Sequence, residues 1–302
     1  MLTPWGDFPA SDAHVHFFSR RFFATLGAQC GKSAEEAAGA AGWDLPPEDP
    51  AELARTWAAE MDRHGVARAA LISSVPGDEA SVIAAAAACP GRFHAFAMVN
   101  PLSGNATVAA GLEAVCLFPA MHLYSMADAR VEPLLEQAAA AHCAVFVHCG
   151  VLTVGVRRKL GLPSTFDMRY SNPLDLHAVA LRFPATPFLI PHFGAGYLRE
   201  ALMLADLCPN VYLDTSSSNS WMRYEGLELK TVFRRAIEAV GAWRLLFGTD
   251  SSFFPRGWNY EVFEAQVQAL LALGISGEEA RLILGENLER IFGGQAEQPA
   301  AG

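Results

Sequence analysis

The sequence predicts a distorted (β/α)8 barrel, that is, a TIM barrel, and two observations carry this prediction. Eight short apolar runs rich in Val, Ile, Leu and Phe alternate with longer stretches of helical periodicity, a pattern typical of repeated β-α units around a parallel sheet. The chain has 302 residues, a length that fits one closed barrel of eight such units. A doubly wound open sheet is the structural alternative. It would normally carry a glycine-rich phosphate turn after the first run, where the sequence reads Phe17-Phe18-Ser19-Arg20.

The apolar runs are expected to form the strands, because they are short and rich in β-branched and aromatic residues. Strands of a parallel barrel are buried on both faces, and a hydrophobic content of 52% agrees with that architecture. The eight expected strands are Ser11–Phe17, Ala67–Val75, Phe93–Asn100, Ala114–Ala120, Ala144–Gly150, Pro187–Gly194, Val211–Ser217 and Leu245–Ser252.

The stretches between these runs are expected to be helices. Several end at proline or glycine, and the last begins with Ser276 and Glu279 at the spacing of a capping box. The expected helices are Pro50–His64, Asp78–Cys89, Asp128–His142, Asn172–Phe183, Gly196–Leu207, Leu227–Val240, Tyr260–Leu273 and Ser276–Ile291, and the tail Gly293–Gly302 is expected to fray.

Two connections, at about residues 18–50 and 151–171, are longer than is usual in a compact domain. Both follow the C-terminal end of a strand, which is the catalytic face of a barrel. We therefore expect a single domain over residues 1–302, with these two loops as lids and substrate walls over the active-site face. The alternative is that the two loops are additions without a role in the active site, or that they form oligomer contacts.

The composition excludes several classes of protein. Only 18% of the residues are charged, which rules out intrinsic disorder, and a net charge of −10 disfavours nucleic acid as a partner. No apolar stretch approaches the roughly 18 residues of a membrane span, and no secretory signal is evident. The six cysteines form no C-x-x-C pair, and Cys149 is interpreted as structural. We expect a cytoplasmic protein without membrane contact.

The first expected strand carries two histidines in the order Asp12-Ala13-His14-Val15-His16. A period of two places Asp12, His14 and His16 on one face, with Ala13 and Val15 on the helix-facing side. Both imidazoles are therefore expected to point inward near the barrel mouth. Two neighbouring imidazoles would repel each other if protonated, and a divalent metal resolves this because neutral imidazole is its common ligand.

Three further strands end in a polar residue after an apolar run. His148 ends the fifth strand, His192 the sixth and Asp250 the eighth. Closure of a barrel brings corresponding strand ends toward a shared axis. Mixed histidine and carboxylate ligands suit Zn²⁺, with Mn²⁺ and Fe²⁺ as alternatives. One such histidine would be weak evidence, but the combination with the H-x-H pair predicts a metal centre.

These motifs resemble those of the amidohydrolase superfamily, in particular the amidohydrolase-related branch that includes aminocarboxymuconate-semialdehyde decarboxylase. The resemblance implies a divalent metal at the mouth of a distorted barrel, with His14, His16, His148 and Asp250 as ligands and His192 just beyond the metal. The matching stretches are Asp12-Ala13-His14-Val15-His16, Val147-His148-Cys149-Gly150, Pro191-His192-Phe193-Gly194-Ala195-Gly196, Val211-Tyr212-Leu213-Asp214-Thr215-Ser216 and Phe247-Gly248-Thr249-Asp250.

The number of metals also follows from this resemblance. Binuclear members often carry a bridging carboxylated lysine at the end of the fourth strand, and the stretch Ala114–His122 contains no lysine. A single metal is therefore expected. His122 is a candidate for an additional site residue, with a structural role as the alternative.

The expected chemistry follows from the ligand set. Three or four protein ligands leave a position for water, and a metal lowers the pKa of that water toward about 7. His192 is expected to act as general base or electrostatic stabiliser, and Asp250 to orient the nucleophile and carry a proton to the leaving group. The metal and His192 together would polarise a carbonyl group.

Substrate contacts are expected from cations and aromatic rings near the strand ends. Arg256, after the eighth strand, and Arg169, in the second long loop, could bind a carboxylate, and Trp258 could stack on a planar substrate. Ordinary solvated charges and core packing are the alternatives. Further candidates are Arg157, Arg158, Lys159, Phe17, Phe18, Trp221, Ser216–Ser218 and Asn219.

Three functions remain open at this point. The leading one is metal-dependent hydrolysis of a C–N or C–O bond in a small molecule. The second is non-oxidative decarboxylation of an unsaturated or aromatic acid, which would need a carboxylate clamp such as Arg256 near the metal. The third is a non-catalytic barrel that binds a ligand or partner, and it predicts sub-stoichiometric metal in purified protein. A homodimer is expected from general frequencies alone.

Overall fold

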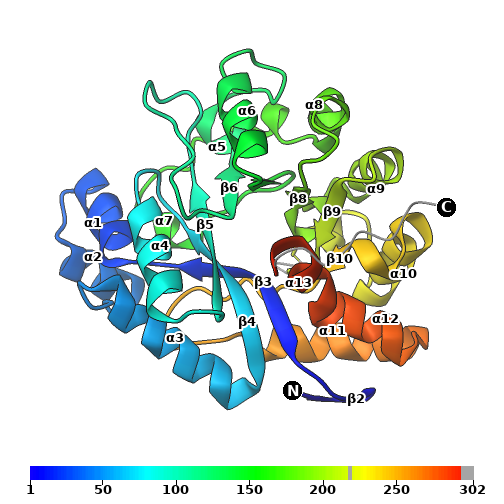
Figure 1. The fold of residues 1–302 in the computed structure, drawn as a ribbon. Helices are drawn as coiled ribbons and strands as arrows, with labels where there is room; N and C mark the ends of the chain where they lie inside the picture. Colours follow the sequence, from blue (N-terminus) through cyan, green and yellow to red (C-terminus); the bar gives the residue numbers. More distant parts are fainter. Residues whose placement is uncertain (217–219, 294–302) are drawn as a thin grey trace.

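The computed structural model describes residues 1–216 and 220–293, and its centre is a parallel eight-stranded sheet. Each strand pairs with the next in sequence, so the sheet runs in the order β10-β9-β8-β7-β6-β5-β4-β3 and curves into a barrel (Figure 1). The predicted TIM barrel is thereby confirmed. The strands are β3 (Ala10–Phe17), β4 (Val66–Ser73), β5 (Phe93–Met98), β6 (Ala114–Leu117), β7 (Ala144–Val147), β8 (Phe188–Ile190), β9 (Val211–Asp214) and β10 (Leu245–Leu246), preceded by a short hairpin of β1 (Leu2–Thr3) and β2 (Gly6–Asp7).

The seam between the first and last strands is closed by isolated contacts rather than by a ladder. The amide of Ala13 donates to the carbonyl of Phe247 at 2.7 Å, and the amide of His16 donates to the carbonyl of Ser251 at 2.7 Å. Val15 and Ser251 form an isolated parallel bridge. The barrel is therefore nearly closed, and its weakest seam joins the segments that carry His14, His16 and Asp250.

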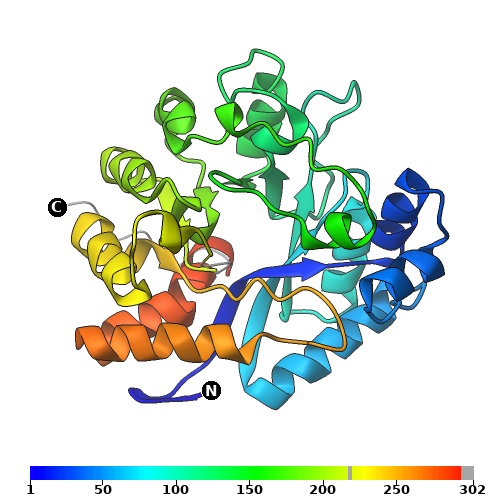
Figure 2. The same cartoon turned by 180° about the vertical axis from the view of Figure 1, so that it is seen from behind.

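Helices surround the strands, as Figures 1 and 2 show from opposite sides. Helices α3 and α11 have the predicted bounds, and the Ser276–Glu279 capping box is present. The last predicted helix is interrupted by a π-helical turn at Leu282–Glu286. The surrounding helices are α3 (Pro50–His64), α4 (Glu79–Ala88), α6 (Glu132–Ala140), α8 (His177–Arg182), α9 (Leu198–Leu207), α10 (Leu229–Val240), α11 (Tyr260–Leu273), α12 (Gly277–Arg281) and α13 (Asn287–Phe292).

The two long connections are not plain loops, which corrects the expectation from sequence. The first contains α1 (Arg20–Gln29) and α2 (Ala34–Ala41), and the second contains α7 (Gly155–Lys159). Side chains of all three helices pack into one apolar cluster, and Figure 2 shows α7 beside α1 and α2. Helix α2 begins with a capping box from Ser33 to Glu36, a spacing that was readable in the sequence.

Several expected strands are too long at their C-terminal ends. β6 stops at Leu117 and is followed by the short helix α5 (Pro119–His122). After β8 the chain turns at Pro191–Gly194, and after β10 it leaves the ladder at once. The expected strands through Gly194 and Ser252 include His192 and Asp250, whose φ values of 57° and 58° lie outside the β region.

Strand β3 contains an irregularity that changes which side chains face inward. Its register against β4 shifts between Asp12 and Val15, as in a β-bulge. Ala13 therefore packs in the inner apolar cluster, not on the helix side as expected. Asp12 does not share the face of His14, and its carboxylate instead reaches Thr249 and the indole of Trp258.

Asp12 is a buried junction between β3 and the segment after β10. Its carboxylate accepts the amides of His14 and Thr249, the Thr249 hydroxyl at 2.5 Å and the Trp258 indole N–H at 2.8 Å. Burial raises the pKa of this carboxyl group to about 6, against the lowering effect of those four donors.

We predict that Asp12→Asn lowers the free energy of unfolding by about 1–3 kcal/mol, because the amide group leaves buried donors without an acceptor. Urea denaturation monitored by circular dichroism measures this change. The matched control is Asp206→Asn on the exposed side of α9, which should unfold like wild type. Equal stability of the two variants would refute the structural role of Asp12.

No helix within residues 1–216 and 220–293 is long and apolar enough to cross a membrane. All six cysteines are free, and Cys149 is buried in the core, where burial raises the pKa of its thiol. Cys149 therefore has the environment of a structural residue, as the sequence indicated.

Candidate metal centre

His14, His16 and Asp250 converge at the C-terminal mouth of the barrel. One potential ligand atom from each residue lies within 4.8 Å of the others, and the three side chains form a candidate metal site. The Asp250 carboxylate is 3.2 Å from His16 Nε2 and 3.8 Å from His14 Nε2. Both histidines therefore turn the same ring nitrogen toward the shared carboxylate.

His14 is held in one tautomer by Asp214, which ends strand β9. The Nδ1–H group of His14 donates to the Asp214 carboxylate at 2.6 Å, and both side chains are buried. Since a carboxylate can only accept, the proton sits on Nδ1 and the lone pair of Nε2 is free. Such a partner on the far nitrogen is the usual companion of a metal-binding histidine.

His16 has an equivalent partner on the segment after β4. Its Nδ1 lies 2.7 Å from the hydroxyl of Ser74, and that hydroxyl donates to the carbonyl of Ile72. When the Ser74 hydroxyl donates to Ile72, its oxygen can accept from His16 Nδ1–H, and this tautomer leaves the Nε2 lone pair for a metal. Both imidazoles therefore have a hydrogen-bond partner on Nδ1, and both turn Nε2 toward Asp250.

His192 is oriented by the backbone after β9. Its Nδ1–H group donates to the carbonyl of Ser216 at 2.8 Å, and its ring centre is 5.0 Å from that of His14. A run of left-handed residues from His192 to Ala195 turns the chain sharply and directs the ring into the mouth. The free Nε2 can accept a proton from a molecule bound there.

His148 lies at the end of β7, beside the three converging residues but outside their tight group. Its ring centre is 5.4 Å from that of His192, and the ring stacks on Phe118. Its Nδ1 is buried without a hydrogen-bond partner among the described residues. A buried orphan nitrogen next to a candidate metal site is an observation that a bound cation would explain.

The pKa shifts of three histidines favour the neutral form that binds a metal, whereas the shift of His14 favours its protonated form. Burial lowers the pKa values of His16, His148 and His192, so these imidazoles are neutral at physiological pH. Burial would lower the pKa of His14 as well, but the charge of Asp214 raises it. The pKa of Asp250 lies well below its usual range, because the hydrogen bond with His16 and nearby imidazoles outweigh the effect of burial.

Arg256 is the predicted substrate-binding residue that lies nearest to these groups. Its guanidinium donates to the carbonyl of Asp250 at 3.1 Å and to the hydroxyl of Ser252 at 2.9 Å. It also covers the ring of Phe253 at 4.5 Å. The exposed remainder of the guanidinium can receive an anionic group at the mouth.

The other predicted substrate contacts occupy different positions. Arg169 is exposed and pairs with Asp167, and none of its hydrogen bonds among the described residues reaches the converging groups. Trp258 is buried with its N–H group on Asp12, a position that supports a structural role. Lys159 and Arg157 of the same loop join α7 to the other two helices, since Lys159 donates to the carbonyl of Ala41 in α2 and Arg157 donates to Gln29 in α1.

Some aromatic candidates are buried in the core, and one lies at the barrel mouth. Phe17 and Trp221 are buried in the core, whereas Phe18 stacks on the ring of His16. His122 lies on α5 with its ring 6.5 Å from that of Tyr124, and burial lowers its pKa to about 4. Among the expected polar contacts after β9, Ser216 adjoins His14, and Ser217, Ser218 and Asn219 lie outside the described residues.

Two positioning residues of this centre, Asp214 and Ser74, were not assigned from sequence. Asp214 ends an apolar strand in the same way as His148 and Asp250, so a signal for it was present. Ser74 follows β4 in an ordinary polar stretch, and nothing in the sequence distinguishes it.

A family model described as Amidohydrolase matches residues 11–294. This chain belongs to the amidohydrolase family. The match covers nearly the whole barrel and confirms the resemblance inferred from the strand-end motifs. Among curated proteins, the amidohydrolase described here is similar to the protein fluG of Emericella nidulans, with 36% identity over 85 residues. That match covers 28% of this chain and only 10% of fluG.

Solved structures share the fold of this amidohydrolase at low identity. A probable 2-pyrone-4,6-dicarboxylic acid hydrolase from Acinetobacter baumannii, with citric acid bound, has 14% identity and a TM-score of 0.62 over 95% of this chain and 100% of its own. The 5-carboxyvanillate decarboxylase LigW2 from Novosphingobium aromaticivorans, with manganese, has 13% identity and a TM-score of 0.62, over 95% of this chain and 97% of its own. A zinc-bound amidohydrolase from Burkholderia multivorans has 15% identity and a TM-score of 0.59, over 95% of this chain and 99% of its own.

We predict that Asp214→Asn weakens Zn²⁺ affinity by roughly 10–100-fold while preserving the fold. Asparagine can still accept the Ser216 amide, which lies 2.5 Å from Asp214, but its NH₂ group then faces His14 Nδ1. His14 would have to move its proton to Nε2 and lose its free lone pair. Titration against a zinc indicator measures the change, and an affinity equal to that of Asp206→Asn would contradict this role.

Proposed function

We propose that this amidohydrolase is a metal-dependent hydrolase that cleaves a C–N or C–O bond of a small, carboxylate-bearing molecule. The observation that carries the proposal is the convergence of His14, His16 and Asp250, with the Nε2 atoms of both histidines facing one carboxylate. His148 is proposed as the fourth ligand, because its buried Nδ1 has no other partner among the described residues. Zn²⁺ suits this donor set best, and Mn²⁺ or Fe²⁺ also fit.

A bound divalent metal supplies an acidified water and a Lewis acid for the scissile carbonyl. The chain supplies the rest. His192 accepts a proton at Nε2, since its Nδ1 proton is held by the Ser216 carbonyl. The Asp250 carboxylate, whose pKa is held low, is proposed to orient the nucleophile and to carry a proton to the leaving group.

Arg256 is proposed to bind the carboxylate of the substrate. Its contacts with Asp250 and Ser252 hold the guanidinium at the edge of the mouth, and part of it stays exposed. The packed helices α1, α2 and α7 are proposed to form the wall on the adjacent side, where Phe18 stacks on His16. Six free cysteines support a reducing, cytoplasmic location.

The test is a panel of carboxylate-bearing amides, lactams and lactones, compared with their carboxamide analogues. We expect hydrolysis of one class, loss of activity on chelation, and recovery on adding Zn²⁺ or Mn²⁺. We expect Arg256→Gln to raise KM for the carboxylate-bearing compound more than for its carboxamide. Activity that survives complete metal removal would refute the proposal.

Decarboxylation on the same residues is the second candidate, and the position of Arg256 beside Asp250 is the observation that favours it. A guanidinium there could equally hold the carboxylate that is lost. Quantification of CO₂ released from unsaturated and aromatic acids separates the two reactions, because hydrolysis of the panel compounds releases none.

A further inference from the structure

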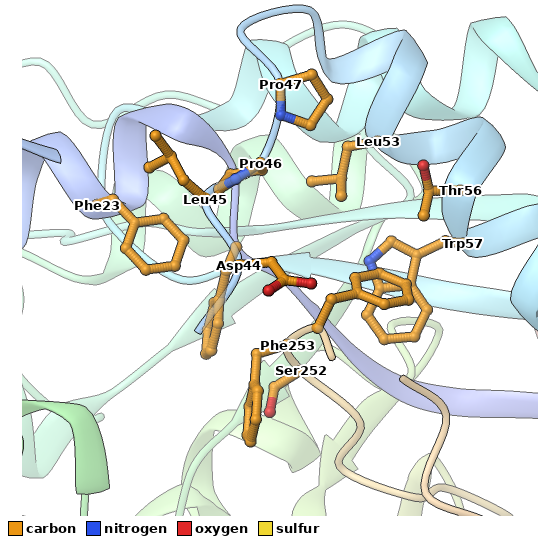
Figure 3. Close-up of a pocket in the computed structure, with 12 residues that line it drawn as sticks. Phe23, Asp44, Leu45, Pro46, Pro47, Leu53, Thr56, Trp57, Ser252 and Phe253 are labelled. Atoms are coloured by element: carbon orange, nitrogen blue, oxygen red, sulfur yellow. The ribbon is translucent and has the colours of Figure 1, made fainter. Parts of the chain in front are cut away.

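A cavity of about 210 Å³ adjoins the candidate metal centre and has no role in the proposed hydrolysis. It is lined by α1, the segment after α2, helix α3 and the segment after β10 (Figure 3). Phe18 and Ser252 belong to its lining, and they also adjoin the metal centre through His16 and Arg256. The cavity is thus a neighbour of the active site with its own chemistry.

The lining combines aromatic rings with one negative charge. Five of the twelve lining residues are aromatic, and Asp44 is the one among the twelve that carries a formal charge. Figure 3 shows the Asp44 carboxylate in the middle of the pocket, with the rings of Phe23, Trp57 and Phe253 around it. Phe23 and Trp57 are almost fully buried, so they form a fixed floor.

The Asp44 carboxylate has no hydrogen bond or ion pair among the described residues, although the Asp44 amide is anchored to the carbonyl of Phe254 at 2.8 Å. The backbone is therefore held while the charge stays available. An anion would be repelled here, and a purely apolar ligand would strip water from the carboxylate without replacing it. A cation satisfies the carboxylate, and the faces of aromatic rings attract it. Phe253 offers no free face, because Trp43 and Arg256 cover its ring.

We propose that this pocket binds a small organic cation, with an ammonium group at Asp44 and an apolar body between the aromatic side chains. The volume agrees, because an engineered apolar cavity of about 150 Å³ already holds benzene. A one-ring ammonium compound therefore matches the pocket in size as well as in charge. This ligand class is distinct from the carboxylate-bearing substrate proposed for the metal centre.

Benzyltrimethylammonium is the probe, because its quaternary nitrogen has no lone pair and cannot coordinate a metal. Isothermal titration of the full chain, after chelator treatment, should show saturable binding with one site. Benzyl alcohol, which has the ring without the charge, should bind roughly tenfold more weakly or worse. Because the protein is metal-free, failure of the hydrolase proposal would leave this result unaffected.

Asp44→Asn should weaken binding of the probe by roughly tenfold or more, because it removes the charge and keeps the shape. The matched control is Glu48→Gln, an exposed residue of the same segment that does not line the pocket. It should bind the probe like wild type. Absence of saturable binding, unchanged affinity in Asp44→Asn, or an equal loss in Glu48→Gln would each overturn the proposal.

Discussion

His192→Asn is expected to retain bound metal at the wild-type level while kcat falls by about 10²–10⁴-fold. The reason is that His192 Nε2 is the free proton acceptor beside His14, whereas the candidate metal group consists of other residues. Asparagine is chosen because it tolerates a left-handed backbone better than most residues, and φ at this position is 57°. Steady-state kinetics and metal analysis of one preparation measure both quantities.

The matched control for this substitution is His142→Asn. His142 also has a positive φ, of 54°, but it is exposed at the end of helix α6. It should keep wild-type activity and metal content. Full activity in His192→Asn would show that His192 is not the proton acceptor, and loss of metal would place it among the ligands.

Asp250→Asn is expected to lower Zn²⁺ affinity by more than the roughly 10–100-fold predicted for Asp214→Asn. Asp250 supplies the one negative charge in the candidate group, and both histidines face it. Asparagine again suits the local backbone, with φ of 58°, so the fold should persist. Activity should fall with the metal and should be recovered only in part at high zinc concentration.

The control for this change is Asp206→Asn, an equal change of charge on the exposed side of α9. The expected order of zinc affinities is Asp206→Asn equal to wild type, then Asp214→Asn, then Asp250→Asn. An Asp250→Asn protein that binds zinc as tightly as Asp206→Asn would show that the metal does not bind where His14 and His16 converge.

The location of the site could be predicted from sequence because a barrel converts chain position into spatial position. A polar residue at the end of an apolar strand lies at the mouth, whatever its distance along the chain. That rule predicts from the sequence that His14, His16 and Asp250 meet. The same rule extends to Asp214, whose place at the end of β9 carries an equivalent signal.

The orientation of individual side chains was harder to predict, because it depends on local departures from regular strands. The bulge in β3 turns Asp12 away from the face of His14, and a period of two cannot detect an extra residue. His192 and Asp250 have left-handed backbones and lie beyond strands that end earlier than expected. Neither is a glycine, so the sequence carried no mark of the turn.

The hydrogen-bond partner of His16 could not be predicted from the sequence. Ser74 follows β4 and becomes a positioning residue only because β4 pairs with β3. That pairing places the Ser74 hydroxyl against His16. The helices α1 and α2 were missed for a different reason. Their glycine-rich flanks suggested a loop, although Ser19 and the Ser33–Glu36 pair cap them in the structure.

The most direct test is a crystal structure of protein incubated with Zn²⁺, with anomalous data collected at the zinc edge. The account predicts one anomalous peak at the barrel mouth, within bonding distance of His14 Nε2, His16 Nε2 and the Asp250 carboxylate. A fully formed barrel with no peak between these three side chains, or with zinc bound only elsewhere, would contradict it.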